Sequence, residues 1–305
     1  MPSSSVTLTH ETAVAAAPER LFDIVADTEG APRYAPTQVH AEILSKEEGG
    51  EDLVRRWVYD GRSVRSWQVR RILDRAALRI VFTHVAAPGA SPRGQRGEWS
   101  FTATDEGTTL VKVVHTLEAE DAEVLRGLSG NLDRNIPGQL GTYKFVGELG
   151  DNLARLYVSG SDSVVLPGTA ADVFARLLLP EVWAALDPEP VRVSVRPLGD
   201  DTEFIGLAPA VDGLTDENST ETGYLRVLLS DREFAYKRLD LPPHMHAEIG
   251  RWTVQSAGPD KVQVTVGQSV TVNMNALASG VEEARAAAEV ELRESLRRVL
   301  DAVAA

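Results

Sequence analysis

Alternating apolar and polar residues dominate the first half of the chain, which then ends in a helical pattern. Strand-like runs are predicted at residues 7–15, 39–45, 53–59, 64–73, 79–85, 97–103 and 109–117. Pro18 opens a short helix after the first run, and turn signals such as Glu48-Gly49-Gly50 separate later runs. From about 121 to 157, Leu and Tyr recur near helical spacing. This order predicts an α+β unit in which an antiparallel sheet wraps around one long C-terminal helix.

The second half of the chain repeats this order. Val173-Phe174 follows Leu21-Phe22 by 152 positions, and Trp252 follows Trp99 by 153. Strands are predicted at 164–167, 192–198, 203–207, 223–229, 233–239, 250–255 and 262–272, with helices at 170–179 and 281–303. Matching anchors in a matching order of elements indicate an internal repeat. We therefore expect two tandem domains, residues 1–157 and 158–305, with the boundary near 157–163.

The run at residues 64–71 stands out by its chemistry. Side chains alternate between the two faces of a strand, so Arg65, Trp67, Val69 and Arg71 share one face. If that face points inward, two guanidiniums enter an apolar interior and need acceptors there, and a ligand rich in carbonyl oxygens is one such acceptor. The alternative is an outer face with solvated arginines and Trp67 lying against them.

Composition narrows the classes of function. The net charge of −14 argues against nucleic-acid binding. The chain has no cysteine, which excludes disulfides, thiolate nucleophiles and thiolate metal sites. We see neither a signal peptide nor a run of membrane-spanning length, so we expect a cytoplasmic protein without a membrane partner. Residues 55–79 hold eight arginines against two acids, which suits an acidic partner or a solvated sheet edge kept from aggregating by charge.

Four stretches carry a resemblance to a known family: Ala41-Glu42-Ile43-Leu44, residues 64–71, Glu98-Trp99-Ser100-Phe101 and Asn131-Leu132-Asp133-Arg134-Asn135. With the order of elements, they resemble the helix-grip fold of START and Bet v1-like proteins. More narrowly, the chain resembles the two-domain aromatase/cyclases of bacterial type II polyketide synthases. Trp67 and Arg71 match the family's tryptophan and the arginine four positions after it, while Arg65 stands where an aromatic residue is often found. The motifs cover residues 1–157, and element order carries the resemblance over 164–305.

The resemblance implies an activity. The substrate would be a poly-β-ketone tethered to an acyl carrier protein, and other polyketide synthase subunits would be partners. The enzyme would promote first-ring aldol closure between C7 and C12, dehydration to an aromatic ring, or both. A methylene between two carbonyls is already acidic, so positioning, enolate stabilisation and proton transfer suffice, with no cofactor or metal. The alternatives are a non-catalytic carrier of hydrophobic or polyketide ligands, and a scaffold acting through the arginine-rich segment.

The resemblance also implies pocket residues in the first domain. Arg71 would hold carbonyl or enolate oxygens with its rigid fork of donors. The structural alternative for Arg71 is an internal salt bridge to an acid such as Asp133. We expect further substrate contacts from Trp67, Arg65, Trp99, Tyr34 and Gln38.

The last helix of the first domain leaves two assignments open. Asn131, Asn135 and Gln139 share one face at a spacing of four, in a helix that Pro137 is expected to kink. Alignment with the family instead favours Asp133, which lies about 160° from Asn135 around the helix. Asp133 or Asn135 would assist proton transfer and Asn131 would contact substrate, unless these residues only cap or bond locally. On the strands, His84 is a candidate proton shuttle or else a histidine satisfied within the fold, and His115 has the same status.

The second domain departs from this pattern. Aligning residues 224–231 with 67–74 places Leu228 opposite Arg71, and the last helix, from 282 to 300, has no Asn or Gln. Tyr224, Arg226 and Trp183 remain candidate lining residues. We expect either a second pocket for a later step such as dehydration, or a diverged copy that supports the first domain; the missing polar set favours the latter.

Overall fold

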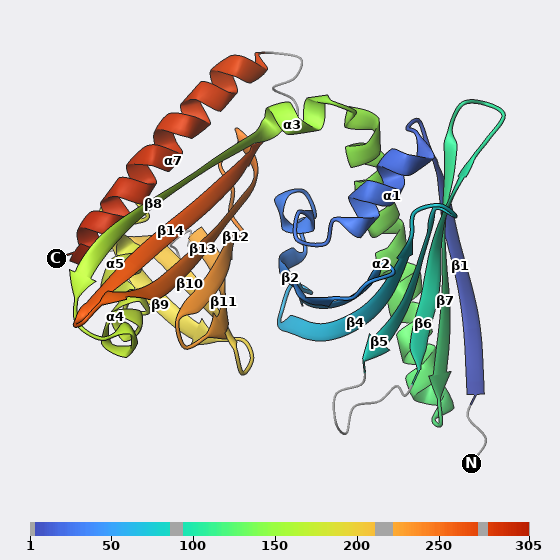
Figure 1. The fold of residues 1–305 in the computed structure, drawn as a ribbon, viewed down its shortest axis with the longest axis horizontal. Helices are drawn as coiled ribbons and strands as arrows, with labels where there is room; N and C mark the ends of the chain where they lie inside the picture. Colours follow the sequence, from blue (N-terminus) through green and yellow to red (C-terminus); the bar gives the residue numbers. More distant parts are fainter. Residues whose placement is uncertain (1–3, 86–93, 211–221, 274–279, 305) are drawn as a thin grey trace. The chain divides into compact units, whose positions relative to one another are not determined.

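The computed structural model describes residues 4–85, 94–210, 222–273 and 280–304. Contacts divide the chain into two compact units, one of Met1–Val58 and Arg65–Leu153 and the other of Tyr59–Val64 and Ala154–Ala305. Each unit holds one seven-stranded antiparallel sheet and a long helix that follows the last strand of that sheet (Figure 1). The predicted α+β architecture of two tandem helix-grip units is confirmed.

The first unit follows the predicted order of elements. These are β1 (Ser4–Val14), α1 (Pro18–Ala26), the 3-10 turn η1 (Ala31–Arg33), β2 (Gln38–Lys46), β3 (Glu51–Tyr59), β4 (Val64–Asp74), β5 (Arg79–Val85), β6 (Gln95–Ala103), β7 (Thr109–Ala119) and α2 (Ala122–Leu149). The sheet order is β1-β7-β6-β5-β4-β3-β2, so the first strand pairs with the last and β2 forms the opposite edge.

The core of this unit lies between the sheet and one stripe of α2. Alternate residues of β7 are buried, as the period of a strand requires. From α2, the apolar stripe Ile136, Leu140 and Tyr143 packs into the same cluster at helical spacing. α2 continues through Pro137 and ends at Leu149 rather than near residue 157, because Gly150 adopts a φ of 59°, which costs glycine little. A separate short helix, α3 (Asn152–Leu156), follows.

The second unit repeats the plan, and its strands β8 and β13 begin several residues earlier than the sequence predicts. Its elements are β8 (Tyr157–Pro167), α4 (Ala170–Leu177), α5 (Pro180–Ala184), β9 (Val191–Pro197), β10 (Thr202–Pro209), β11 (Thr222–Ser230), β12 (Glu233–Arg238), β13 (Met245–Gly258), β14 (Lys261–Val272) and α7 (Val281–Ala304). The sheet order is β8-β14-β13-β12-β11-β10-β9. β8 pairs with β14 from Tyr157 onward. The first half of β8 is polar, and it forms a strand because β14 supplies hydrogen-bond partners for its backbone, which outweighs local propensity.

Strand register places matching residues at matching points of the two sheets. In the first sheet, Arg71, Phe82, Gly97 and His115 are successive cross-strand partners. In the second sheet, the same places are taken by Arg226, Tyr236, Gly250 and Gln268. We call these the first and second transverse rows.

The rows correct the sequence alignment of the two halves. Arg226, and not Leu228, is the counterpart of Arg71. The sequence alignment slipped because β11 carries a register shift between Leu228 and Ser230, and because a shorter turn joins β11 to β12 than joins β4 to β5. Such irregularities change residue counts without changing the places of side chains on the sheet.

Candidate functional site

Arg71 is buried on the inner face of β4 and ties three elements together. Its Nε and Nη2 donate to the two carboxylate oxygens of Asp52 on β3, at 2.9 and 2.6 Å. Nη2 also donates to the carbonyl of Ala26 at 3.1 Å, and Nη1 donates to that of Val25 at 3.5 Å. Those carbonyls end α1, whose last turn carries no basic residue of its own. A cation at this point satisfies exposed carbonyls and complements the helix dipole.

This geometry decides between the two faces considered for residues 64–71. Val69 and Arg71 are buried and Trp67 packs against the core, so their face is the inner one, while Arg65 at the start of β4 is exposed. The internal salt bridge considered for Arg71 exists, but the acid is Asp52 and not Asp133.

Tyr34 lies close to the end of α1. The Tyr34 side chain is buried, and its hydroxyl donates to the carbonyl of Ile24 at 3.1 Å. Tyr34 and Arg71 therefore satisfy three consecutive carbonyls at the end of α1. Gln38 opens β2 and is also buried.

Arg56 is a second interior guanidinium, which the sequence analysis did not single out. It lies on β3, its Nη2 donates to Oγ1 of Thr28 at 3.1 Å, and it hydrogen-bonds the hydroxyl of Tyr143 on α2. The Tyr143 hydroxyl in turn accepts from Nε2 of Gln139 at 3.0 Å. Within the described residues, Nε of Arg56 is buried without a hydrogen-bond partner. Burial lowers the pKa of Arg56 from its usual range, yet a guanidinium stays charged in proteins.

Aromatic rings and two histidines complete the interior beside Arg56. Trp67 stacks on His84 with ring centroids 6.1 Å apart, and Phe82 contacts both His84 and His115. Burial lowers the pKa of His84 to about 4 and that of His115 to about 4. Both imidazoles are therefore neutral at pH 7, and each can accept one hydrogen bond and donate another. Trp99 meets Tyr143 edge to face, with ring centroids 5.5 Å apart.

The polar residues predicted on α2 separate to different sides of the helix. Asn131 and Asn135 are exposed, because the stripe of Ile136, Leu140 and Tyr143 determines which side of α2 faces the sheet. Asn131 bonds to Arg134 on the helix surface. Asp133 is more than half exposed, but it points toward β1 and lies 3.0 Å from Nε2 of His10. Of these side chains, Asp133 thus lies against the sheet and Asn131 and Asn135 do not.

The second unit contains the same guanidinium device. Arg226 is buried on β11, and its Nε donates to Oε2 of Glu203 on β10 at 2.7 Å. Its Nη1 donates to the carbonyl of Leu178, which caps α4, at 3.2 Å. Trp183 and Tyr224, the other lining residues predicted here, are buried with ring centroids 5.9 Å apart. The expected placing of Leu228 opposite Arg71 was wrong because the alignment slipped, and polar side chains are buried in this unit even though α7 has no Asn or Gln.

The arginine-rich segment 55–79 does not form an open basic patch. Acids from outside the segment pair with Arg70, Arg75 and Arg79 on the surface; these acids are Glu51, Asp23 and Glu98. Arg56 and Arg71 point inward. A scaffold function through a positive surface loses support, since four of the eight arginines, Arg70, Arg71, Arg75 and Arg79, already form ion pairs.

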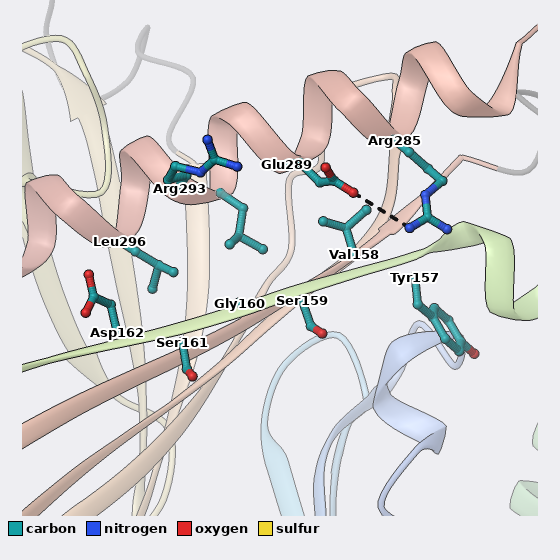
Figure 2. A pocket seen from close by; sticks show the side chains of 11 residues that line it. Tyr157, Val158, Ser159, Gly160, Ser161, Asp162, Arg285, Glu289, Arg293 and Leu296 are labelled. Carbon is teal, nitrogen blue, oxygen red and sulfur yellow. Dashed lines mark ion pairs between the residues drawn. The ribbon is translucent and has the colours of Figure 1, made fainter.

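A groove of about 490 Å³ runs between β8 and α7 in the second unit (Figure 2). Its charged side chains are mixed in sign, and Arg285 is already engaged by Glu289 at 3.7 Å and by the carbonyl of Arg155. None of the predicted site residues lines it, so we assign the candidate site to the unit interiors. Among the described residues, no cluster of His, Asp or Glu is suited to hold a metal ion. No helix in the described parts of the chain is long and apolar enough to cross a membrane.

Comparison with known proteins places this architecture in a family. A family model described as polyketide cyclase/dehydrase and lipid transport matches residues 5–156. The granaticin polyketide synthase bifunctional cyclase/dehydratase of Streptomyces violaceoruber is 28% identical over 298 residues, covering 95% of this chain and 89% of that protein. The actinorhodin polyketide synthase bifunctional cyclase/dehydratase of Streptomyces coelicolor is 27% identical over 276 residues, covering 83% and 84%.

Solved structures match over both units. The di-domain ARO/CYC StfQ from the steffimycin biosynthetic pathway superposes with a TM-score of 0.78 at 25% identity, covering 97% of each chain. The di-domain ARO/CYC BexL from the BE-7585A biosynthetic pathway has a TM-score of 0.78 at 24% identity, covering 98% of this chain and 99% of that one. The chain therefore has the di-domain aromatase/cyclase fold. It belongs to the polyketide cyclase/dehydrase family, and its homologues are bifunctional cyclase/dehydratases, as the resemblance implied.

Proposed function

We propose that this protein is a polyketide cyclase/dehydratase that acts on a poly-β-ketone carried by an acyl carrier protein. It closes the first ring between C7 and C12 in the interior of the first unit and dehydrates the product. One observation carries the proposal: the buried Arg56 guanidinium has an unpartnered Nε–H and shares this interior with two neutral histidines and two tryptophans. The names of the curated relatives support the reaction class.

The proposed reaction is an intramolecular aldol addition followed by loss of water. A base removes one proton from a methylene between two carbonyls, and the resulting enolate carbon bonds to a ketone carbon. That ketone's oxygen takes up a proton and becomes a hydroxyl. The hydroxyl and the second proton of the attacking carbon then leave as water, which forms the ring double bond.

Each interior residue has a proposed part in these steps. The imidazoles of His84 and His115 are neutral at pH 7 and would relay protons as hydrogen-bond donors and acceptors, since a pKa of about 4 makes each a weak base. Arg56 would donate to the enolate or alkoxide oxygen, a kind of stabilisation worth about 3 kcal/mol for one donor. Trp67 and Trp99 would hold the chain in a folded conformer.

Arg71 receives a positioning role in this proposal. Four of its hydrogen bonds already join β3, β4 and α1. Asp133 would orient His10 from α2. We give Asn131, Asn135 and Arg65 no part in the chemistry, because all three are exposed.

Product analysis in a reconstituted minimal polyketide synthase tests the proposal. The wild-type protein should shift the products to one first-ring regiochemistry. Arg56→Lys should reduce that shift about a hundredfold, with a smaller fall in melting temperature than Arg71→Lys causes, because a lysine cannot reproduce the fork of donors. Arg71→Lys should lower both the melting temperature and the yield. An unchanged product mixture from wild type, with the polyketide still bound, would instead identify a carrier.

A further inference from the structure

His10 on β1 and Asp133 on α2 form a pair that leads from solvent into the first unit. Nε2 of His10 lies 3.0 Å from Oδ1 of Asp133. The Asp133 side chain is 57% exposed, whereas that of His10 is 15% exposed. Because a carboxylate only accepts hydrogen bonds, this contact keeps a proton on Nε2 of His10 and leaves Nδ1 of the neutral ring as an acceptor.

Strand register places His10 beside His115. His115 on β7 pairs across the sheet with Leu8 of β1, and His10 is the next residue of β1 on the same face. His10 is thus the diagonal neighbour of His115, at a spacing that aromatic side chains can bridge. Burial is the main cause of the lowered pKa of His115, and the charge of His10 is the second cause. The two imidazoles therefore interact across β1 and β7.

Each of these two rings has a nitrogen without a partner. Among the described residues, Nδ1 of His10 and Nδ1 of His115 are buried and make no hydrogen bond. Nδ1 of His10 is an acceptor, and Nδ1 of the neutral His115 ring can carry its proton and donate it. The two atoms are complementary. A hydrogen bond between them, direct or through one water, would remove the cost of burying both unpaired.

His115 also reaches the interior assigned to the chemistry. Its neighbour in the first transverse row is Gly97, where a Cβ would lie 2.4 Å from Cζ of Phe82. The absence of that side chain lets the Phe82 ring lie against the strand. The ring contacts both His115 and His84, with centroids 5.2 and 6.2 Å apart. His115 therefore stands between the solvent-facing pair and the interior that holds His84.

Two other charges of α2 also reach β1, and they are already paired. Lys144 and Glu148 lie 2.8 Å apart, and each also bonds to the backbone of β1. Within the described parts of the chain, the titratable groups that face His10 are thus Asp133 from α2 and His115 from β7.

We propose that His10, oriented by Asp133, holds the proton that the reaction removes and exchanges it with the polyketide through His115. When the methylene C–H bond breaks, its electron pair stays on carbon and its proton passes to one nitrogen of His115. The proton on the other nitrogen of His115 moves to Nδ1 of His10, whose imidazolium is stabilised by the Asp133 carboxylate. The proton later returns along the same path to the alkoxide oxygen.

This relay explains how a weakly basic His115 can serve in the reaction, because the proton does not stay on it. His10 acts through His115 and is a positioning residue. The inference rests on the proposed function and adds to it the place where the removed proton is held.

Long-range ¹H–¹⁵N NMR of the full-length protein with ¹⁵N-labelled histidine tests the pairing without substrate. The chain has six histidines, and spectra of His10→Gln and His115→Gln assign these two. With neutral rings, His10 should carry its proton on Nε2 in wild type. Asp133→Asn should abolish that preference, because an amide can donate as well as accept. A wild-type His10 protonated on Nδ1, or a His115 signal that His10→Gln does not shift, would overturn the relay.

Product yield tests the transfer, with the poly-β-ketone made in place by a reconstituted minimal polyketide synthase. His10→Gln should lower the yield of ring-closed product about a hundredfold. Asp133→Asn should lower it less, and Asp133→Glu should restore most of it. Since Asp133 is largely exposed, this second pair of variants keeps the test valid even if His10→Gln unfolds the protein.

Glu148→Gln is the matched control, because Glu148 also joins α2 to β1 but does so through Lys144 and a backbone amide. It should keep the wild-type yield. If wild type is active and both His10→Gln and Asp133→Asn match it, the relay is refuted while the proposed function stands. A wild-type protein that leaves the product mixture unchanged would refute the proposed function, and the relay with it.

Discussion

Removing the charge of Asp52 should destabilise the first unit far more than removing the charge of its neighbour. Asp52 and Glu51 are adjacent on β3, and their partners Arg71 and Arg70 are adjacent on β4. Both members of the Arg71–Asp52 pair are 3% exposed, whereas Arg70 and Glu51 are 49% and 30% exposed. The chain thus contains a buried ion pair and a surface ion pair at adjacent positions, and both join β3 to β4.

The expected magnitudes follow from burial. Asp52→Asn leaves the Arg71 guanidinium buried without a counter-charge, which costs about 3–5 kcal/mol. Glu51→Gln removes a solvated pair, which contributes about 0–1 kcal/mol. Because Arg71 also holds the last carbonyls of α1, the loss at Asp52 should loosen residues 18–26 in particular.

Hydrogen exchange followed by mass spectrometry measures the local stability of α1. A local measurement is needed because a chain of two units does not unfold in a single transition. Peptides from α1 should exchange faster in Asp52→Asn and at the wild-type rate in Glu51→Gln. Urea unfolding monitored in parallel gives the overall loss. Equal effects of the two substitutions would refute the reasoning, since burial would then not determine the value of the pair.

Three further outcomes are expected. Glu203→Gln should lower the free energy of unfolding by about 1–2 kcal/mol, less than Asp52→Asn, because Glu203 is 26% exposed and solvent can replace part of its charge. Amide hydrogen exchange should become faster in α4 only. Acid should weaken the first unit: the pKa of His115 falls from an ordinary 6.5 to about 4 on folding, so stability is complete above pH 6.5 and declines as the pH falls toward 4. At pH 5.5 the loss is about 1.4 kcal/mol for this group, and urea unfolding of His115→Gln should show a flatter pH profile. Gly97→Ala should lower the free energy of unfolding by about 1–3 kcal/mol in melting experiments, because the new Cβ would lie 2.2 Å from the backbone oxygen of Val114. In Gly250→Ala the new Cβ would clash only with the Tyr236 side chain, so a second substitution, Tyr236→Leu, should restore stability.

Local periodicity determined most of the fold. Strand alternation and the helical stripe through Leu140 and Tyr143 depend only on residue spacing, and the repeated Trp99 and Trp252 anchors depend only on order. Periodicity therefore predicted two α+β units, and the family resemblance added the helix-grip fold, while the pattern of residues 64–71 left open whether their arginine face is buried. These features are readable because each arises from neighbours within a few positions along the chain.

Tertiary structure decided which groups meet. Arg71 could be recognised as a buried cation, but its partner Asp52 follows from the pairing of β3 with β4 and from where α1 ends. Arg56 and the adjacent Arg55 look alike in sequence, and register shifts between β2 and β3 obscure which of them faces inward. On α2, Asn131 and Asn135 have the spacing of one helix face, yet the apolar stripe through Ile136 packs against the sheet and leaves both asparagines exposed. Contacts between distant elements depend on register and on competition for burial, and neither is written in the spacing of any one segment.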